Sequence, residues 1–219
     1  MWIVYVVLFA VALAVSTALT YAALKIASRV GFVDNPSARK LHANPTPLGG
    51  GLAIIATVFG VLGLLTVAAL VFDQHPEYLP IDPGIQAYFG GAKLVLKNLV
   101  VVAIGGLALM VMGLVDDKRG LSPTVKLTVQ VLVAALLVKN GISITLYLHW
   151  QPAGWIATVV WMVFVMNSFN LLDNMDGLSS GVAVIIGSVF FVVAIETGQF
   201  FIAAALVVFV ASVLGFLVF

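Results

Sequence analysis

Residues 94–117 have the sequence LVLKNLVVVAIGGLALMVMGLVDD, an apolar run that ends in two adjacent aspartates. About 20 apolar residues, at about 1.5 Å per residue, form a helix long enough to cross the roughly 30 Å hydrocarbon core of a membrane. The run 94–115 therefore predicts a membrane-spanning helix. Asp116 and Asp117 predict where this helix leaves the membrane.

Similar apolar runs occupy most of the remaining chain. Of all residues, 63% are hydrophobic and only 9% are charged, whereas soluble domains average about 25% charged residues. We therefore predict an all-α fold, a polytopic membrane helical bundle of about seven transmembrane helices, which forms a single transmembrane domain over residues 1–219. The predicted spans are 2–24, 50–72, 94–115, 124–140, 155–170, 180–197 and 200–218.

The basic residues are unevenly divided between the two sides of this bundle. The first side, by counting spans, carries the loops 25–49, 116–123 and 171–179. The second side carries the loops 73–93, 141–154 and 198–199. The basic residues on or beside the first side are Lys25, Arg29, Arg39, Lys40, Lys118, Arg119 and Lys126, and those on the second are Lys93, Lys97 and Lys139. The positive-inside rule makes the first side cytoplasmic, with the N-terminus outside and the C-terminus inside.

Composition also limits the classes of partner and of metal site. The net charge is +1 and the chain has no cysteine. Such a small charge predicts no nucleic-acid partner. Without thiolates, any metal must be held by carboxylate, amide or imidazole groups. The apolar outer faces of the spans are compatible with a monomer and with a homodimer.

Asp116 and Asp117 are the first of three polar segments on the predicted cytoplasmic face. Ionisable groups near a membrane are costly and usually mark pathways or sites. Two adjacent carboxylates repel each other unless a cation joins them, so a divalent ion with oxygen ligands is one interpretation, with one aspartate as a base. A solvated turn that caps the next helix is the alternative, and the spacing does not separate the two.

The second segment contains amide and carboxylate side chains at every third position. A regular α-helix would scatter such a series around its axis, whereas a 3₁₀ or broken segment would align it. Asn174 and Gly177 are candidate break points at the end of the preceding helix. An ordinary polar loop that caps the helix over 180–197 is the alternative. The series comprises Asn167, Asn170, Asp173 and Asp176.

The third segment, in the first loop, combines Arg39, Lys40 and His42 with a proline turn and the glycines at 49–51. A guanidinium, an ammonium and backbone amides freed by glycines suit a phosphate. The same residues also satisfy the positive-inside rule, and the glycines also suit close helix packing. In the fourth span, Lys126 and Gln130 are one turn apart. Lys126 can reach the two aspartates or snorkel to the membrane interface.

Taken in order, these motifs resemble the polyprenyl-phosphate N-acetylhexosamine-1-phosphate transferases. The first loop is more similar to the WecA/TagO-like branch, which uses UDP-N-acetylglucosamine, than to the muramoyl-pentapeptide branch related to MraY. The matching motifs are PSARKLH at 36–42 with the following prolines and glycines, Asp116-Asp117 with KLTVQ at 126–130, and NSFNLLDNMDGL at 167–178.

The resemblance implies a reaction and roles for the polar residues. A sugar-1-phosphate, N-acetylglucosamine-1-phosphate, would pass from a UDP-sugar to undecaprenyl phosphate, a polyprenyl-phosphate lipid, with release of UMP. This reaction would occur at the cytoplasmic face of a bacterial inner membrane and serve cell-envelope polysaccharide synthesis. Mg²⁺, with Mn²⁺ as an alternative ion, would be the cofactor.

The site residues follow motif by motif. Asp116 and Asp117 would be catalytic, and Asn170 with Asp117 would bind the metal ion. Substrate would be bound by Arg39, Lys40, His42, Lys126, Asn167, Asp173 and Asp176, with Asp176 towards uracil.

Two departures from the family pattern stand out. Asn174 replaces the usual glycine between the paired acids and adds a side chain to the nucleotide pocket. The family also continues with a Gly-Asp-x-Gly-Ser motif and a histidine-rich loop, whereas this chain stops at Phe219. The resemblance therefore implies a chain truncated at the C-terminus, with weak or lost catalysis.

Two other classes of protein are compatible with so many apolar runs. A transporter or channel subunit would place polar groups through the bilayer midplane, often on paired broken helices, and the middle spans here are nearly free of charge. A non-catalytic membrane scaffold that binds a partner through helix faces is the third hypothesis.

Overall fold

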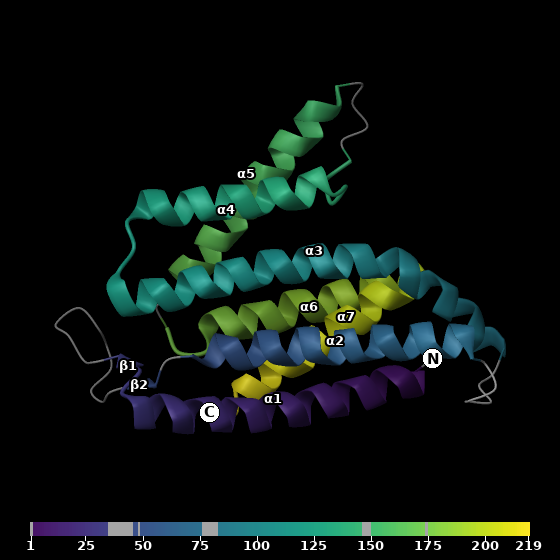
Figure 1. The fold of residues 1–219 in the computed structure, drawn as a ribbon, viewed down its shortest axis with the longest axis horizontal. Coiled ribbons are helices and arrows are strands. Elements are labelled where there is room, and N and C mark those ends of the chain that lie inside the picture. The colour runs from purple at the N-terminus through teal and green to yellow at the C-terminus, as the bar shows by residue number, and fades with distance from the viewer. Residues whose placement is uncertain (1, 35–45, 48, 76–82, 146–149, 174) are drawn as a thin grey trace. The chain divides into compact units, whose positions relative to one another are not determined.

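The computed structural model of the protein describes residues 2–34, 46–47, 49–75, 83–145, 150–173 and 175–219. Within these ranges the chain forms seven helices and one short pair of strands (Figure 1). The predicted all-α class and its seven helical segments are confirmed. The helices are α1 (Trp2–Val30), α2 (Gly50–Gln74), α3 (Pro83–Arg119), α4 (Pro123–Lys139), α5 (Gln151–Leu172), α6 (Leu178–Glu196) and α7 (Phe200–Phe216).

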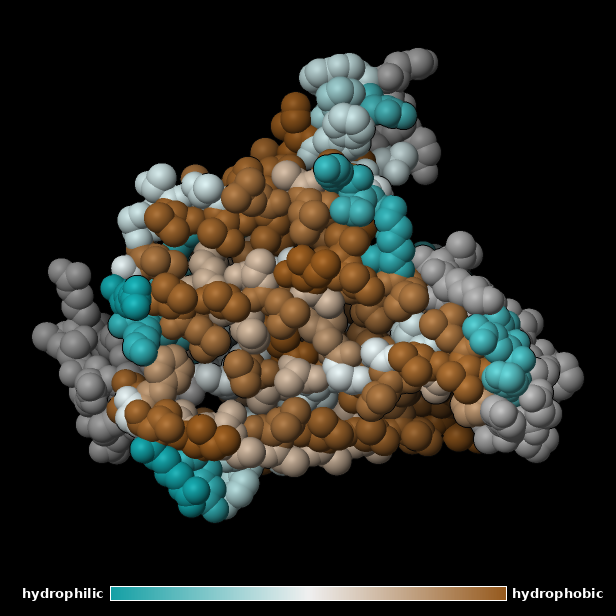
Figure 2. All heavy atoms as spheres, in the orientation of Figure 1, coloured by the Kyte–Doolittle hydropathy of each residue, from teal (hydrophilic) through white to brown (hydrophobic). Residues whose placement is uncertain are grey.

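Among the described helices, five are long and apolar enough to cross a membrane: α1, α2, α5, α6 and, over Val95–Arg119, α3. α7 is apolar but has 17 residues, and α4 has the same length. Large apolar side chains lie on the outside of the helices, for example Leu64 (73% exposed) and Ile185 (66% exposed). Figure 2 shows these hydrophobic surfaces in brown, with the hydrophilic residues towards helix ends. Such surfaces suit a lipid environment, and the protein is a multi-pass membrane protein.

Several helix ends differ from the prediction: α1 continues to Val30, past its predicted end at 24, and α5 begins at Gln151, before its predicted start at 155. The expected loop 73–93 is helical from Pro83 onward, because α3 begins there. The expected loop 116–123 was also wrong at its start, because α3 continues through Asp116 and Asp117 to Arg119. Polarity locates the edge of a hydrocarbon core, but a helix can continue past this edge until its backbone geometry changes.

The two strands, β1 (Val33–Asp34) and β2 (Thr46–Pro47), pair antiparallel with Val33 opposite Pro47. β2 also contacts α1. The paired strands therefore lie beside α1.

The chain forms two compact units. The first comprises Met1–Val67 with Ser180–Phe219, and the second comprises Ala68–Ser179. Each unit has its own helix packing. The prediction of a single transmembrane domain stays a prediction.

In the first unit, α1 and α7 pack through small residues. The Ser16 hydroxyl, fully buried on α1, donates to the carbonyl of Ser212 on α7 at 2.6 Å. Gly215 of α7 faces α1 so closely that an added Cβ would lie 2.9 Å from the carbonyl oxygen of Leu13. Small residues allow helix backbones to approach in a membrane, where apolar surface alone does not drive helices together.

In the second unit, α4 packs against both α3 and α5. Val101 of α3 meets Val133 and Leu137 of α4 in a small apolar core. Gly105 of α3 lets α4 approach, because an added Cβ would lie 3.0 Å from a methyl group of Val133. This packing brings the carboxyl-terminal ends of α3 and α5 to the amino-terminal half of α4, as the polar contacts below establish.

Replacement of Gly215 by alanine should destabilise the first unit, because the new methyl group would press on the backbone of α1. We expect a loss of about 1–3 kcal/mol, typical of overpacking, measured as a lower unfolding temperature in detergent. Gly63→Ala on α2 is the matched control, because nothing lies within 4 Å of its Cβ position. Equal unfolding temperatures for the two variants would contradict the close packing of α1 and α7.

Candidate functional site

The site begins at the turn between α3 and α4. Gly120 has a positive φ of 66°, and its N–H donates to the carbonyl of Asp116 at 2.8 Å. Glycine adopts this left-handed conformation without steric cost, so α3 ends there. Ser122 then caps α4 by accepting from the N–H of Val125 at 3.4 Å, and Pro123 takes the first helical position. The sequence Gly-Leu-Ser-Pro thus folds the chain back on itself in three residues.

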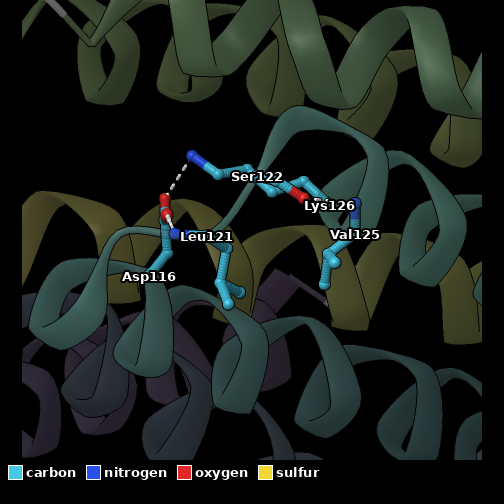
Figure 3. A network of polar contacts seen from close by, with 5 residues as sticks. All are labelled: Asp116, Leu121, Ser122, Val125 and Lys126. Carbon is cyan, nitrogen blue, oxygen red and sulfur yellow. Dashed lines mark hydrogen bonds and ion pairs between the residues drawn. The ribbon is translucent and has the colours of Figure 1, made fainter.

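The Asp116 carboxylate holds this turn together (Figure 3). Its Oδ1 accepts from the N–H of Leu121 at 2.8 Å, and its Oδ2 pairs with the Lys126 ammonium at 2.5 Å. Both side chains are partly buried, at 25% and 31% exposure. The prediction that Lys126 reaches the aspartate turn is confirmed. The capping alternative does not apply to Asp116, because its Oδ1 accepts from an amide of the turn before α4, whereas Ser122 caps α4 itself.

Asp117 lies next to Asp116 on α3, and its side chain is exposed. Adjacent residues of an α-helix are about 100° apart around the axis, so the two carboxylates leave α3 in different directions. Because the Lys126 ammonium offsets the negative charge of Asp116, the Asp117 carboxylate meets less repulsion from its neighbour. Asp116 therefore organises the turn, while Asp117 faces away from that contact.

The amide residues lie at the carboxyl-terminal end of α5. Asn167 and Asn170 are part of a regular α-helix that continues to Leu172, so the expected 3₁₀ or broken segment was wrong over these residues. The Asn167 Nδ2 donates to the Gln130 Oε1 of α4 at 2.7 Å and to the Val163 carbonyl at 2.8 Å. A hydrogen bond to a side chain of another helix and a hydrogen bond to a carbonyl of the same helix each stabilise an amide group on a membrane helix without breaking the helix. Asn170 is exposed one turn later.

The chain leaves α5 at Asp173. The Asp173 N–H still bonds the Phe169 carbonyl at 3.2 Å, and the Asp173 carboxylate accepts from the Ser179 hydroxyl at 2.9 Å. Gly177 has a positive φ of 72°, which confirms it as a break point before α6. Asp176 is exposed in the same turn, and Asn174 lies outside the described residues.

The structure brings some of the predicted site residues together. Lys126 and Gln130 lie one turn apart on one face of α4, about 6 Å along the axis. Through them this face contacts Asp116 of α3 and Asn167 of α5. Arg39, Lys40 and His42 lie outside the described residues, so their predicted role stays a prediction.

Sequence reasoning missed two contacts. Gln130 was noted beside Lys126 but given no role, although its side chain is only 6% exposed. A long polar side chain in an otherwise apolar helix was the signal available for it, because a buried amide needs a partner. Ser179, the partner of Asp173, had no such signal, since a serine at the start of a helix is common.

The oxygen-bearing side chains fit a hard divalent cation in type. Within the described residues, no group of three or more His, Asp or Glu side chains is positioned to hold a metal ion. Mg²⁺ keeps several waters and uses one or two carboxylates together with substrate phosphates, so it does not require such a group. Asp117 and Asn170 supply a carboxylate and an amide oxygen, which are donors that suit Mg²⁺ or Mn²⁺.

The apolar helices and the polar cluster at the ends of α3 and α5 define a multi-pass membrane protein with a site built from three helices. Residues 99–219 match the family model described as Glycosyl transferase family 4. The chain belongs to this family.

Three relatives are named as sugar-phosphate transferases. The chain is 33% identical to the probable undecaprenyl-phosphate N-acetylglucosaminyl 1-phosphate transferase of Bacillus subtilis, over 97% of this chain and 54% of that protein. It is 31% identical to the decaprenyl-phosphate N-acetylglucosaminephosphotransferase of Mycobacterium tuberculosis, over 73% of this chain and 38% of that protein. It is 25% identical to the undecaprenyl-phosphate alpha-N-acetylglucosaminyl 1-phosphate transferase of Yersinia pestis, over 98% of this chain and 52% of that protein. The chain thus spans about half the length of these relatives, or less.

Asp116→Ala should destabilise the turn between α3 and α4, because it removes the acceptor of the Leu121 N–H and leaves Lys126 unpaired. We expect a loss of about 1–2 kcal/mol, measured by thermal unfolding in detergent. The control is Lys118→Ala on the exposed surface of the same helix end, which should change stability by less than about 0.5 kcal/mol. An Asp116→Ala variant as stable as the control would show that the carboxylate does not hold the turn.

Proposed function

We propose that this chain acts as a membrane transferase that moves N-acetylglucosamine-1-phosphate from UDP-N-acetylglucosamine to a polyprenyl phosphate and releases UMP. Family membership and the activities for which the relatives are named support this assignment. The observation that carries it is the meeting of polar side chains from α3, α4 and α5 at the amino-terminal half of α4.

The proposed reaction is the displacement of one phosphate by another. An oxygen of the lipid phosphate forms a bond to the β-phosphorus of the UDP-sugar, and the bond from this phosphorus to the bridging oxygen breaks. The bridging oxygen leaves with UMP, and the lipid keeps the sugar-1-phosphate through a new diphosphate. Converging anions resist this approach, so the protein must hold both partners in line and offset their charge.

The polar residues divide this work. Asp117 receives the proton of the attacking lipid phosphate when that group is protonated. Asp116 fixes Lys126 at the site, and the Lys126 ammonium lies where it can offset phosphate charge. On the nucleotide side, Asn167, Asp173 and Asp176 supply acceptors for the N–H and O–H groups of a UDP-sugar, with Asp176 towards uracil.

The proposed metal site uses Asp117 and Asn170 as ligands for Mg²⁺ or Mn²⁺. When bound, such an ion neutralises negative charge on the diphosphate and orients it. Asn170 is exposed on the last turn of α5, next to the turn that carries Asp176, so its oxygen is accessible to an ion that approaches with the nucleotide.

The proposed location is the bacterial plasma membrane, with the site at the cytoplasmic face and the N-terminus outside. The basic residues near the site, Lys118, Arg119 and Lys126, support this orientation through the positive-inside rule. UDP-sugars are soluble nucleotides, and a site at the membrane interface suits a reaction between such a donor and a lipid acceptor. Arg39, Lys40 and His42, on the same predicted side, would add positive charge for phosphates. Cell-envelope polysaccharide synthesis is the proposed role.

Asp117→Asn should lower the transfer rate at least about 100-fold, because an amide cannot accept the proton and is a weaker metal ligand. The measurement is formation of labelled lipid and release of UMP by purified protein in detergent with labelled UDP-N-acetylglucosamine, undecaprenyl phosphate and Mg²⁺. Glu196→Gln makes the same chemical change at the end of α6 and should leave the rate unaltered.

Two results would overturn the proposal. One is an Asp117→Asn variant that transfers the sugar phosphate at the unchanged rate. The other is a wild-type chain that neither turns over nor binds UDP-N-acetylglucosamine. Binding of UDP-N-acetylglucosamine without turnover would support the proposed substrate. The transfer reaction would then be assigned only to longer members of the family.

A further inference from the structure

Gln130 is a long polar side chain that is only 6% exposed, on a helix whose neighbouring residues are mostly apolar. Burying an amide is costly unless it is hydrogen-bonded. Its partner is the Asn167 side chain on α5, 37 residues away in sequence, at 2.7 Å. The contact joins two helices at a point one turn from Lys126.

The chemistry of the neighbouring groups fixes which way both amides point. The carbonyl of Val163 can only accept, so the Asn167 atom that lies 2.8 Å from it must be the donor Nδ2. The same Nδ2 faces Gln130, so Gln130 must present its acceptor, Oε1. Both hydrogens of the Asn167 amide are thereby used within the protein.

The two hydrogen bonds of Nδ2 also determine where the Oδ1 oxygen of Asn167 points. With its Nδ2 held at two points, the amide plane is fixed, and Oδ1 accepts no hydrogen bond from the described residues. Asn167 is an exposed residue, so its side chain is open to the surroundings of α5. If only the Val163 bond remained, the amide could rotate about that bond, and the oxygen would lose its fixed direction.

We propose that Gln130 is a positioning residue that orients the Asn167 amide so that its Oδ1 accepts a hydrogen bond from an N–H or O–H group of the nucleotide sugar. This inference rests on the proposed function, which supplies the nucleotide sugar as substrate. Gln130 acts through Asn167 and does not touch the ligand. On this face of α4, Lys126 thus sets the position of the Asp116 carboxylate of α3, and Gln130 sets the position of the Asn167 amide of α5.

The test is a cycle of Gln130→Leu, Asn167→Ala and the double variant. The readout is the dissociation constant of UDP-N-acetylglucosamine, measured by calorimetry on the purified chain in detergent. Gln130→Leu should weaken binding about fivefold or more in the wild-type background and less than about twofold when Asn167 is already alanine. Gln130→Glu, which keeps an accepting oxygen, should recover most of the affinity. Gln199→Leu, the same change on an exposed glutamine before α7, should leave affinity unchanged.

A purely structural role for Gln130 would lower affinity equally in both backgrounds, and a direct contact with the ligand would do the same. Either result would overturn the inference. The unfolding temperatures of the same four proteins give a second readout that needs no ligand: the double variant should lose about as much stability as the worse single variant. Additive losses would show that Gln130 does not hold Asn167. A wild-type chain that binds no nucleotide would refute the proposed function, while the stability cycle would still decide the contact.

Discussion

Polar groups beside a hydrocarbon layer are costly unless they find partners within the protein, and α4 supplies such partners from a single face. Lys126 pairs with Asp116 of α3, and one turn later Gln130 accepts from Asn167 of α5. Each contact satisfies groups that would be costly alone in a membrane. Because the two residues share one face, the same contacts that hold α3 and α5 against α4 also gather carboxylate, ammonium and amide groups in one place. Packing and site therefore have a common physical origin in the second unit.

The first unit holds its helices together in a different way. α1 and α7 meet through serine and glycine, and the Ser16 hydroxyl donates to a backbone carbonyl rather than to an ionisable group. Close backbone approach gives such an interface its stability through many small contacts. The contrast indicates where chemistry is expected: the polar pairs lie where α3 and α5 end and α4 begins, whereas the contact of α1 with α7 uses small residues.

The sequence predicted the helices well because a span has a length and a composition that apolar runs reveal directly. Helix ends were predicted less well, since Asp116 and Asp117 are polar but remain helical until Gly120 changes the backbone. The Lys126 contact followed from a short turn that must bring its two helices together. The pairing of Gln130 with Asn167 could not be predicted, because it depends on how α5 is rotated against α4, which no local pattern encodes. The basic residues Arg39, Lys40 and His42 stay predictions.

The α4 face holds its neighbours through specific polar pairs, and an exchange of the two charges of one pair tests this role most directly. Asp116→Lys and Lys126→Asp should each lower the unfolding temperature in detergent, because each places like charges side by side. The double exchange should recover at least about half of the larger single loss, since opposite charges face each other again. A double variant that is as unstable as the sum of the two single variants would contradict the account.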